Sequence, residues 1–231
     1  MILRKLTVFM ALAGALLSGT TAMASSAASA ISPDKALKLL LDGNKKFAAS
    51  GSLENLKKKS KPEIRKNLAK GQHPYAIVLT CSDSRLPAEI IFDKGLGEIF
   101  VARVAGNIAP AEVLGSIEYG IEHLGAPLVL VLGHSKCGAV KATYDTHKAG
   151  AVATVEPNIN SLVKAIDPAV TAALAHNPKA DVEECVAENI KLVAEKLETD
   201  SKIIKEFKEA GKIKIVKGKY DLSTGIVTIL P

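Results

Sequence analysis

The sequence predicts an α/β domain built on a mainly parallel sheet, and three observations predict it. Three short runs without polar alternation are typical of strands buried on both faces: Tyr75 to Thr80, Glu98 to Arg103 and Leu128 to Leu132. A helical pattern from Glu112 to Leu124 separates the second run from the third. Potential metal ligands follow the first and third runs directly, and ligands of open α/β sheets gather at the carboxyl ends of strands.

Composition sets the broad class. The chain has 231 residues, of which 48% are hydrophobic and 23% charged, and this is enough for one sizeable core. We find no repeats and no low-complexity linker, so residues 31–231 are predicted to form a single domain. Because there is no Trp and only four Tyr and five Phe, no stacking platform for nucleic acid is expected.

The N-terminus has the pattern of a secretory signal peptide. Arg4 and Lys5 precede an apolar run, and Ala22-Met23-Ala24 and Ala28-Ser29-Ala30 both fit a cleavage site. We predict a signal peptide over residues 1–24, with cleavage as late as residue 30, and a periplasmic or secreted protein. The alternative is an uncleaved anchor, although the run is short for a spanning helix. No stable membrane insertion is expected after cleavage.

Charge gives little guidance about partners. Removing residues 1–24 lowers the formal charge from +6 to +4, because 28 Lys and Arg then face 24 Asp and Glu. The run Lys57-Lys58-Lys59 could bind nucleic acid, but a solvated helix face is the favoured interpretation.

The remaining elements follow in chain order. Ser32, Pro33 and Asp34 suit the N-cap and first turn of a helix, which Leu37 and Leu40 continue at helical spacing. Further expected helices span Pro62 to Lys70, 155–176 and 180–210, with a break near Asn177-Pro178, and two late strands span Ile213 to Val216 and Ile226 to Leu230.

Cys81, His134 and Cys137 form the candidate metal centre. Thiolate and imidazole are ligands that zinc favours, and three protein ligands leave a fourth position open, as in a catalytic site. If a helix begins at about Ser135, the spacing of His134 and Cys137 lets both converge on one ion, and the helix N-terminus favours a thiolate. A structural histidine is the alternative for His134 alone.

Asp83 has two possible roles beside this centre. It could be the fourth ligand of a closed site, or it could pair with Arg85 and accept a hydrogen bond from a metal-bound water. The guanidinium favours the second role, because it grips a carboxylate bidentately and holds it off the metal. A purely structural ion pair is the third interpretation.

Cys185 lies in a helical pattern and is left over from this set. We expect a buried unreactive thiol, with a further ligand or a disulfide as the alternatives.

These residues carry a resemblance to the β-class carbonic anhydrases. Cys81-Ser82-Asp83-Ser84-Arg85 and His134-Ser135-Lys136-Cys137-Gly138 stand where that family has C-x-D-x-R and H-x-x-C-G, and the resemblance runs from Pro33 to the C-terminus. It implies a four-stranded parallel sheet with an added antiparallel strand. It also implies one Zn²⁺ per subunit on Cys81, His134 and Cys137, and an Asp83–Arg85 dyad. The implied reaction is reversible hydration of carbon dioxide to bicarbonate by attack of zinc-bound hydroxide.

The resemblance extends to the substrate pocket and to assembly. Gln72, Phe100, Tyr119 and Gly138 stand at positions that line the family's pocket, with ordinary packing as the alternative for the first three. The family forms homodimers or dimers of dimers, so Gln72, Phe100 and Tyr119 are expected to serve a partner subunit's site. The helix from Pro33 resembles an arm that such dimers exchange. Val104 departs from the family's asparagine, which puts details of the neighbouring pocket in doubt.

Two other functions fit the same residues. Relatives of this scaffold hydrolyse carbon disulfide or carbonyl sulfide, and pocket access would separate them from a carbon dioxide hydratase. A non-catalytic zinc protein with a closed four-ligand site is the third possibility, and Arg85 beside Asp83 argues against it.

Overall fold

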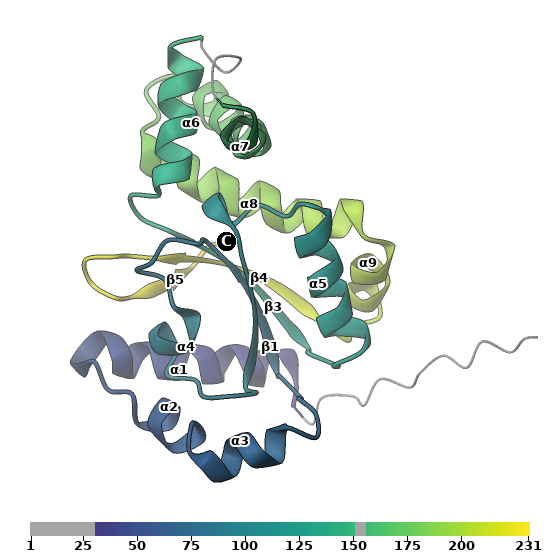
Figure 1. The fold of residues 1–231 in the computed structure, drawn as a ribbon. Helices are drawn as coiled ribbons and strands as arrows, with labels where there is room; N and C mark the ends of the chain where they lie inside the picture. Colours follow the sequence, from purple (N-terminus) through teal and green to yellow (C-terminus); the bar gives the residue numbers. More distant parts are fainter. Residues whose placement is uncertain (1–30, 151–155) are drawn as a thin grey trace, which may run out of the picture.

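One five-stranded sheet organises the protein, whose computed structural model describes residues 31–150 and 156–231 (Figure 1). The spatial order is β2-β1-β3-β4-β5; the first four strands are parallel, and β5 runs antiparallel to β4. The predicted fold class, a mainly parallel sheet with an added antiparallel strand, is confirmed. The strands are β1 Ala76–Thr80, β2 Ile99–Arg103, β3 Leu128–His134, β4 Lys214–Tyr220 and β5 Val227–Ile229. The predicted signal peptide lies outside the described residues.

Helices cover both faces of the sheet. In Figure 1, α1 and α4 lie below it and α5, α8 and α9 lie above it, while α6 and α7 pack on α8 and project from the body. The helices are α1 Pro33–Ser50, α2 Glu54–Lys59, α3 Pro62–Leu68, α4 Ala88–Ile91, η1 Ala105–Asn107, α5 Ala111–Glu122, α6 Gly138–Lys148, α7 Pro157–His176, α8 Val182–Asp200 and α9 Lys202–Glu209. None of the described helices is both long and apolar enough to cross a membrane.

The two central strands form the core. Every residue of β1 and β3 is buried, which agrees with their unbroken apolar sequence. The α1 helix closes the lower face: its Asn44 side chain donates to the carbonyls of Ile91 and Gly225 and accepts from the amide of Val227. Next to it, Gly43 lies against the backbone of Phe92, where a Cβ atom would stand 1.8 Å from the carbonyl oxygen.

Several element boundaries differ from the sequence prediction. The single helix expected over 180–210 is two helices, because Ser201 adopts an extended backbone and caps α9 through a 3.1 Å bond from the amide of Ile204. The β4 strand continues to Tyr220 and not Val216, since its later residues alternate between buried and half-buried. The β3 strand continues through Gly133 to His134.

Candidate metal centre

Cys81, His134 and Cys137 come together at the carboxyl edge of the sheet. Cys81 follows β1, His134 ends the neighbouring strand β3, and Cys137 lies before α6. Their ligand atoms all lie within 4.8 Å of one another, and all three residues are buried. Parallel pairing of β1 with β3 therefore joins two segments that are far apart in the sequence.

The helix after this centre begins later than predicted. The predicted start near Ser135 is wrong: Lys136 has a positive φ of 55°, Cys137 is the N-cap residue, and α6 begins at Gly138. The turn lets His134 and Cys137 converge from outside the helix. The amides of Ala139 and Val140 hydrogen-bond to the Cys137 sulfur, so the N-terminus of α6 still favours a thiolate there.

The imidazole of His134 presents one nitrogen to the two sulfurs. Its Nδ1 lies 2.9 Å from the carbonyl oxygen of Ser135, which can only accept, so Nδ1 carries the proton. The buried Nε2 then holds a lone pair, and it has no hydrogen-bond partner among the described residues. A buried nitrogen without a partner is costly, and a metal ion between it and two thiols would satisfy it. The donor set therefore fits zinc.

The two thiols differ in their tendency to ionise. The Cys137 thiol and the amides of Asp83 and Gly106 donate to the Cys81 sulfur, and these hydrogen bonds hold the pKa of Cys81 well below its ordinary value. The neighbouring Cys81 thiolate and burial raise the pKa of Cys137. Without a bound cation, only one of the two thiols is favoured to ionise. A divalent metal ion between them would favour ionisation of both.

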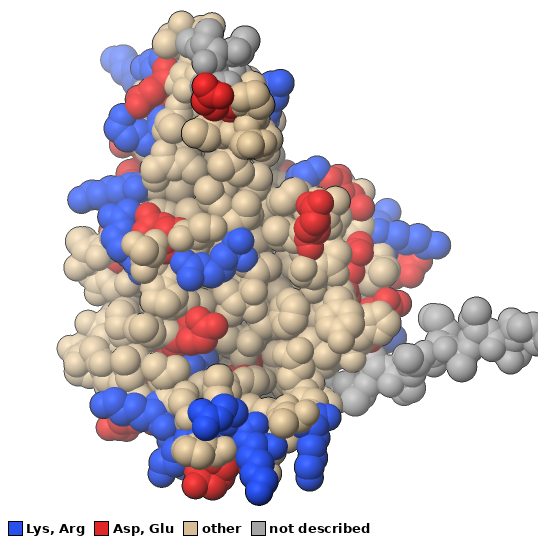
Figure 2. Space-filling view, viewed as in Figure 1, with Lys and Arg blue, Asp and Glu red and all other residues tan. Residues whose placement is uncertain are grey.

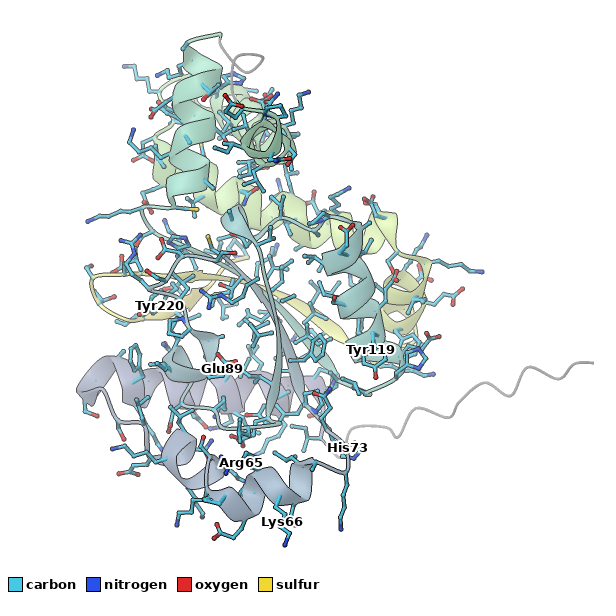
Figure 3. All side chains as sticks on the ribbon, in the orientation of Figure 1. Arg65, Lys66, His73, Glu89, Tyr119 and Tyr220 are labelled. Carbon is cyan, nitrogen blue, oxygen red and sulfur yellow. The ribbon has the colours of Figure 1, made fainter. Side chains whose placement is uncertain are left out.

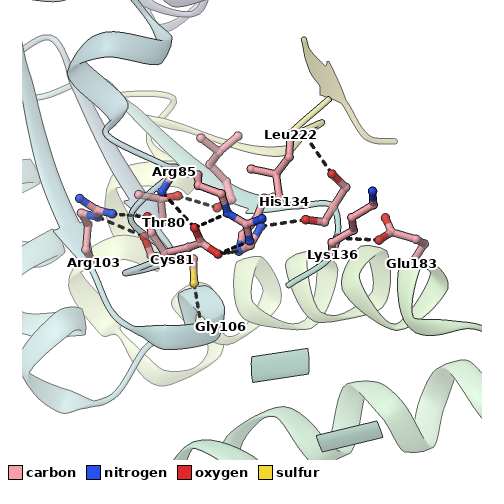
Figure 4. A network of polar contacts seen from close by, with 12 residues as sticks. Thr80, Cys81, Arg85, Arg103, Gly106, His134, Lys136, Glu183 and Leu222 are labelled. Atoms are coloured by element: carbon pink, nitrogen blue, oxygen red, sulfur yellow. Dashed lines mark hydrogen bonds and ion pairs between the residues drawn. The ribbon is translucent and has the colours of Figure 1, made fainter. Parts of the chain in front are cut away.

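Asp83 and Arg85 form a bidentate ion pair beside the centre (Figure 4). Arg85 donates from Nε to Oδ1 at 2.8 Å and from Nη2 to Oδ2 at 2.6 Å, and its amide donates to Oδ1 at 3.0 Å. These hydrogen bonds hold the pKa of Asp83 well below its ordinary value. Its Oδ2 lies 4.0 Å from Nε2 of His134, so the carboxylate faces the metal group without belonging to it.

Several positioning residues were missed by the sequence analysis. Arg103 donates from Nε to the carbonyl of Cys81 at 3.1 Å and from Nη2 to the carbonyl of Asp83 at 2.7 Å, and the Gly106 amide donates to the Cys81 sulfur at 3.3 Å. Arg103 ends β2 and Gly106 follows it, so their place at the carboxyl edge was a usable signal. They fix the backbone of the segment that carries Cys81 and Asp83.

A second set of contacts holds the turn before α6. The Lys136 amide donates to Oε1 of Glu183 at 2.7 Å, and Oε2 of Glu183 pairs with Nζ of Lys219 at 2.5 Å. The Ser135 hydroxyl accepts from the amide of Leu222 at 2.9 Å. Glu183 lies in α8, 47 residues from Lys136, so no local spacing could have revealed this contact.

The predicted pocket residues do not surround the metal group within one chain. Gln72 is exposed and precedes β1, and Phe100 lies in the first half of β2, opposite Ile77. Tyr119 is near the end of α5, away from the carboxyl edge, with its ring 5.1 Å from that of His123 (Figure 3). Gly138 alone adjoins the group, with open space where a Cβ atom would be.

Cys185 is fully buried in α8 and is a free cysteine, which confirms the prediction of a buried thiol. It does not belong to the group formed by the other two cysteines.

Known proteins resemble this chain in sequence. A family model described as carbonic anhydrase matches residues 76–227. A carbonic anhydrase from Mycolicibacterium smegmatis is 38% identical over 200 residues, which are 85% of this chain and 93% of that protein. Carbonic anhydrase 2 from Mycobacterium tuberculosis H37Rv is 47% identical over 110 residues, which are 48% of this chain and 52% of that protein.

Solved structures resemble it in fold. The β-carbonic anhydrase CcaA has a TM-score of 0.67 at 26% identity, over 84% of this chain and 95% of that one. One of two tetrameric β-carbonic anhydrases from Sordaria macrospora has a TM-score of 0.62 at 22% identity, over 85% of this chain and 97% of that one.

Proposed function

The chain belongs to the carbonic anhydrase family, in its β class, and from this premise we propose which of its residues carry out the reaction. It is an enzyme for the reversible hydration of carbon dioxide to bicarbonate and a proton. The observation that carries the assignment of roles is the buried, unpartnered Nε2 of His134 among two cysteine sulfurs.

We propose that Cys81, His134 and Cys137 hold one zinc ion per subunit. Zinc bound there would supply a Lewis acid that makes water nucleophilic near neutral pH. The protein's part is to fix the three ligands: Ser135 holds the imidazole by its Nδ1–H, and Gly106 donates to the Cys81 sulfur. Gly138, exposed beside Cys137, leaves room for carbon dioxide to approach.

Asp83 is proposed to act next to the metal and not on it. Both of its carboxylate oxygens accept from Arg85, which supports a site whose fourth position is free. An ionised Asp83 accepts a hydrogen bond from the nucleophilic water and thereby directs its lone pair toward carbon dioxide. Its depressed pKa keeps it ionised throughout the neutral range and well into the acid range.

We propose a homodimer or a dimer of dimers, in which Gln72, Phe100 and Tyr119 line the site of the partner subunit. Their distance from the metal group within one chain and the tetrameric Sordaria relatives support this assignment.

Residues 1–24 are proposed to be a signal peptide, and the mature protein is proposed to be periplasmic or secreted. The basic start, the apolar run and the two A-x-A sites support export.

The direct test is stopped-flow hydration of carbon dioxide by the purified protein, with zinc content measured on the same sample. We expect hydration to stop when a chelator removes the zinc and to return when zinc is restored. A zinc-loaded protein that is inactive at every pH would contradict the proposal. It would favour carbon disulfide or carbonyl sulfide as the substrate. Activity that appears only at high pH would instead indicate an Asp83-ligated resting state.

Arg85→Ala is expected to lower kcat/KM at neutral pH by about a hundredfold without loss of zinc, because the freed carboxylate can turn toward the metal. The pH profile distinguishes this from mere loss of structure: the lost activity should return partly at high pH, and Arg85→Lys should be only partly impaired. Zinc content and pH–rate profiles of both variants provide the check. An Arg85→Ala enzyme with full neutral activity would refute the role of the dyad.

Removing the ion pair also has a predictable effect on stability. The pKa of Asp83 is depressed in the folded chain, so the pair stabilises the fold above the ordinary Asp pKa and loses this contribution only as the pH falls below it. The free energy of unfolding of both chains can be measured across the acid range. The difference between Arg85→Ala and the native chain should be smallest at the lowest pH.

A further inference from the structure

Seven surplus positive charges gather in one short part of the chain. Residues 45–70 contain nine Lys and Arg against two Glu, a larger excess than the formal charge of +6 of the whole protein. They span the end of α1, α2 and α3, which lie together below the sheet (Figure 1). Figure 2 shows blue side chains along this lower edge, and Figure 3 shows Lys66 extending from α3 away from the sheet. We call this the basic edge; its cations are Lys45, Lys46, Lys57, Lys58, Lys59, Lys61, Arg65, Lys66 and Lys70.

These cations are not neutralised by neighbours. Among the described residues, none of the nine takes part in an ion pair, whereas on α9 Lys202, Lys205 and Lys208 each pair with a glutamate. All but Lys59 are exposed. The charge of the basic edge is therefore available to an external partner.

Two of the three helices that display the charge, α2 and α3, add no buried residue to the core. Helices this short are not stable alone, so something must hold them in place.

Nearby carboxylates are used to anchor α2 from inside. The buried Asp93 accepts from the amides of Asn55 and Leu56 at 3.1 and 2.8 Å, and Glu98 accepts from the Asn55 side chain at 2.6 Å and from the Gly95 amide at 2.8 Å. These acids turn inward to the start of α2, where its free N–H groups and dipole favour them. The lysines at the other end of α2 have no acidic partner among the described residues, and the anchored helix holds them in a fixed position.

We propose that the basic edge is a docking surface for an anionic phospholipid bilayer. Its cations spread over three helices, which suits an extended layer of negative charge better than a small anion. A cluster of this size is attracted to anionic lipid surfaces, with about a fivefold gain in binding for each cation near the surface. Nucleic acid is the less suitable polyanion, because Phe47 is the one aromatic residue in 45–70 and offers no stacking platform.

Docking by this edge leaves the metal group accessible. The α3 helix leads into the amino end of β1, whereas Cys81 follows the carboxyl end of the same strand. The enzyme would thus be held at a membrane while carbon dioxide and bicarbonate reach its site from the solvent. The surface is a property of the described residues and does not depend on retention of the N-terminal segment.

The test is co-sedimentation of the full chain with vesicles that contain phosphatidylglycerol, compared with vesicles of phosphatidylcholine alone. An apolar N-terminal segment would bind both kinds of vesicle, so the difference between them reports the effect of charge. Arg4 and Lys5 of that segment contribute to this difference, and the variants below assign the part that belongs to the basic edge. We expect binding to phosphatidylglycerol that is lost at about 1 M salt, where the Debye length is about 3 Å. Equal binding to both vesicle types, or none, would overturn the proposal.

A matched pair of variants locates the effect. Lys57→Gln, Lys58→Gln and Lys61→Gln combined should weaken binding at least about tenfold, and Lys202→Gln, Lys205→Gln and Lys208→Gln combined, with the same change in net charge, should weaken it much less. Circular dichroism and unchanged carbon dioxide hydration would show that both triple variants fold. An equal loss in both would mean a non-specific charge effect, and binding to single-stranded nucleic acid without vesicle binding would mean a different partner. Either result would overturn the proposal.

Discussion

Cys81→Ser is expected to lower carbon dioxide hydration by about three orders of magnitude or more and to reduce the zinc content of the purified protein. A serine hydroxyl stays protonated at neutral pH and is a much poorer zinc ligand than a thiolate. The change also replaces the sulfur that accepts from the Gly106 amide. Without the metal, water is not acidic enough to attack carbon dioxide rapidly. Stopped-flow rates and zinc content on the same preparation measure both effects.

The chain offers a matched control in Cys185→Ser. Cys185 is also buried and also a free cysteine, but it lies outside the metal group. We expect this variant to keep its zinc and its rate, with a modest loss of stability. The ligand assignment would be wrong if Cys185→Ser lost the metal, or if Cys81→Ser kept both metal and activity.

Gly43→Ala is expected to lower the free energy of unfolding by about 3 kcal/mol. The new Cβ atom would stand 1.8 Å from the carbonyl oxygen and 2.7 Å from the carbonyl carbon of Phe92, and a backbone cannot move aside as a flexible side chain can. The helix propensity of alanine offsets about 1 kcal/mol of this cost. Separation of α1 from Phe92 would also strain the Asn44 contacts to Ile91 and Gly225. Denaturant unfolding measures the difference.

Gly115→Ala is the control that shows whether the cost of Gly43→Ala comes from the close approach of α1 to the Phe92 backbone. Gly115 lies within α5 and is exposed, and a Cβ atom added there would have no neighbouring atom within 4 Å. The same substitution should therefore stabilise the chain by about 0.5–1 kcal/mol. Opposite signs for the two variants are the expected result. A Gly43→Ala chain as stable as the native one would show that α1 can shift without cost.

The sequence was most informative where one physical signal dominated. The unbroken apolar runs of β1 and β3 identified the buried centre of the sheet, and their parallel pairing follows from the helical segments between them. The rule that ligands gather at carboxyl ends then brought Cys81 and His134 together before any geometry was known. The bidentate Asp83–Arg85 pair likewise agrees with the expected chemistry of a carboxylate beside a guanidinium.

Prediction was weakest where two weak signals competed or where the partner was remote. Lys136 adopts a left-handed backbone conformation, which a glycine at this position would have predicted and a lysine does not. The start of α6 was therefore placed too early. Lys217 and Lys219 made the end of β4 look polar, although the intervening Gly218 is buried beside Leu130. The contact of Glu183 with the Lys136 amide depends on how α8 packs, which no local pattern encodes.

The pairing of β1 with β3 has a consequence for how the enzyme matures. Cys81 and His134 lie more than fifty residues apart in the chain, and they meet only when these two strands lie side by side. In the unfolded chain, closing that loop has an entropic cost that the folded sheet no longer bears. A metal ion held by these residues therefore binds the folded state preferentially and acts as a reversible cross-link between central strands. Metal supply would then govern the lifetime of the folded chain as well as its catalytic rate.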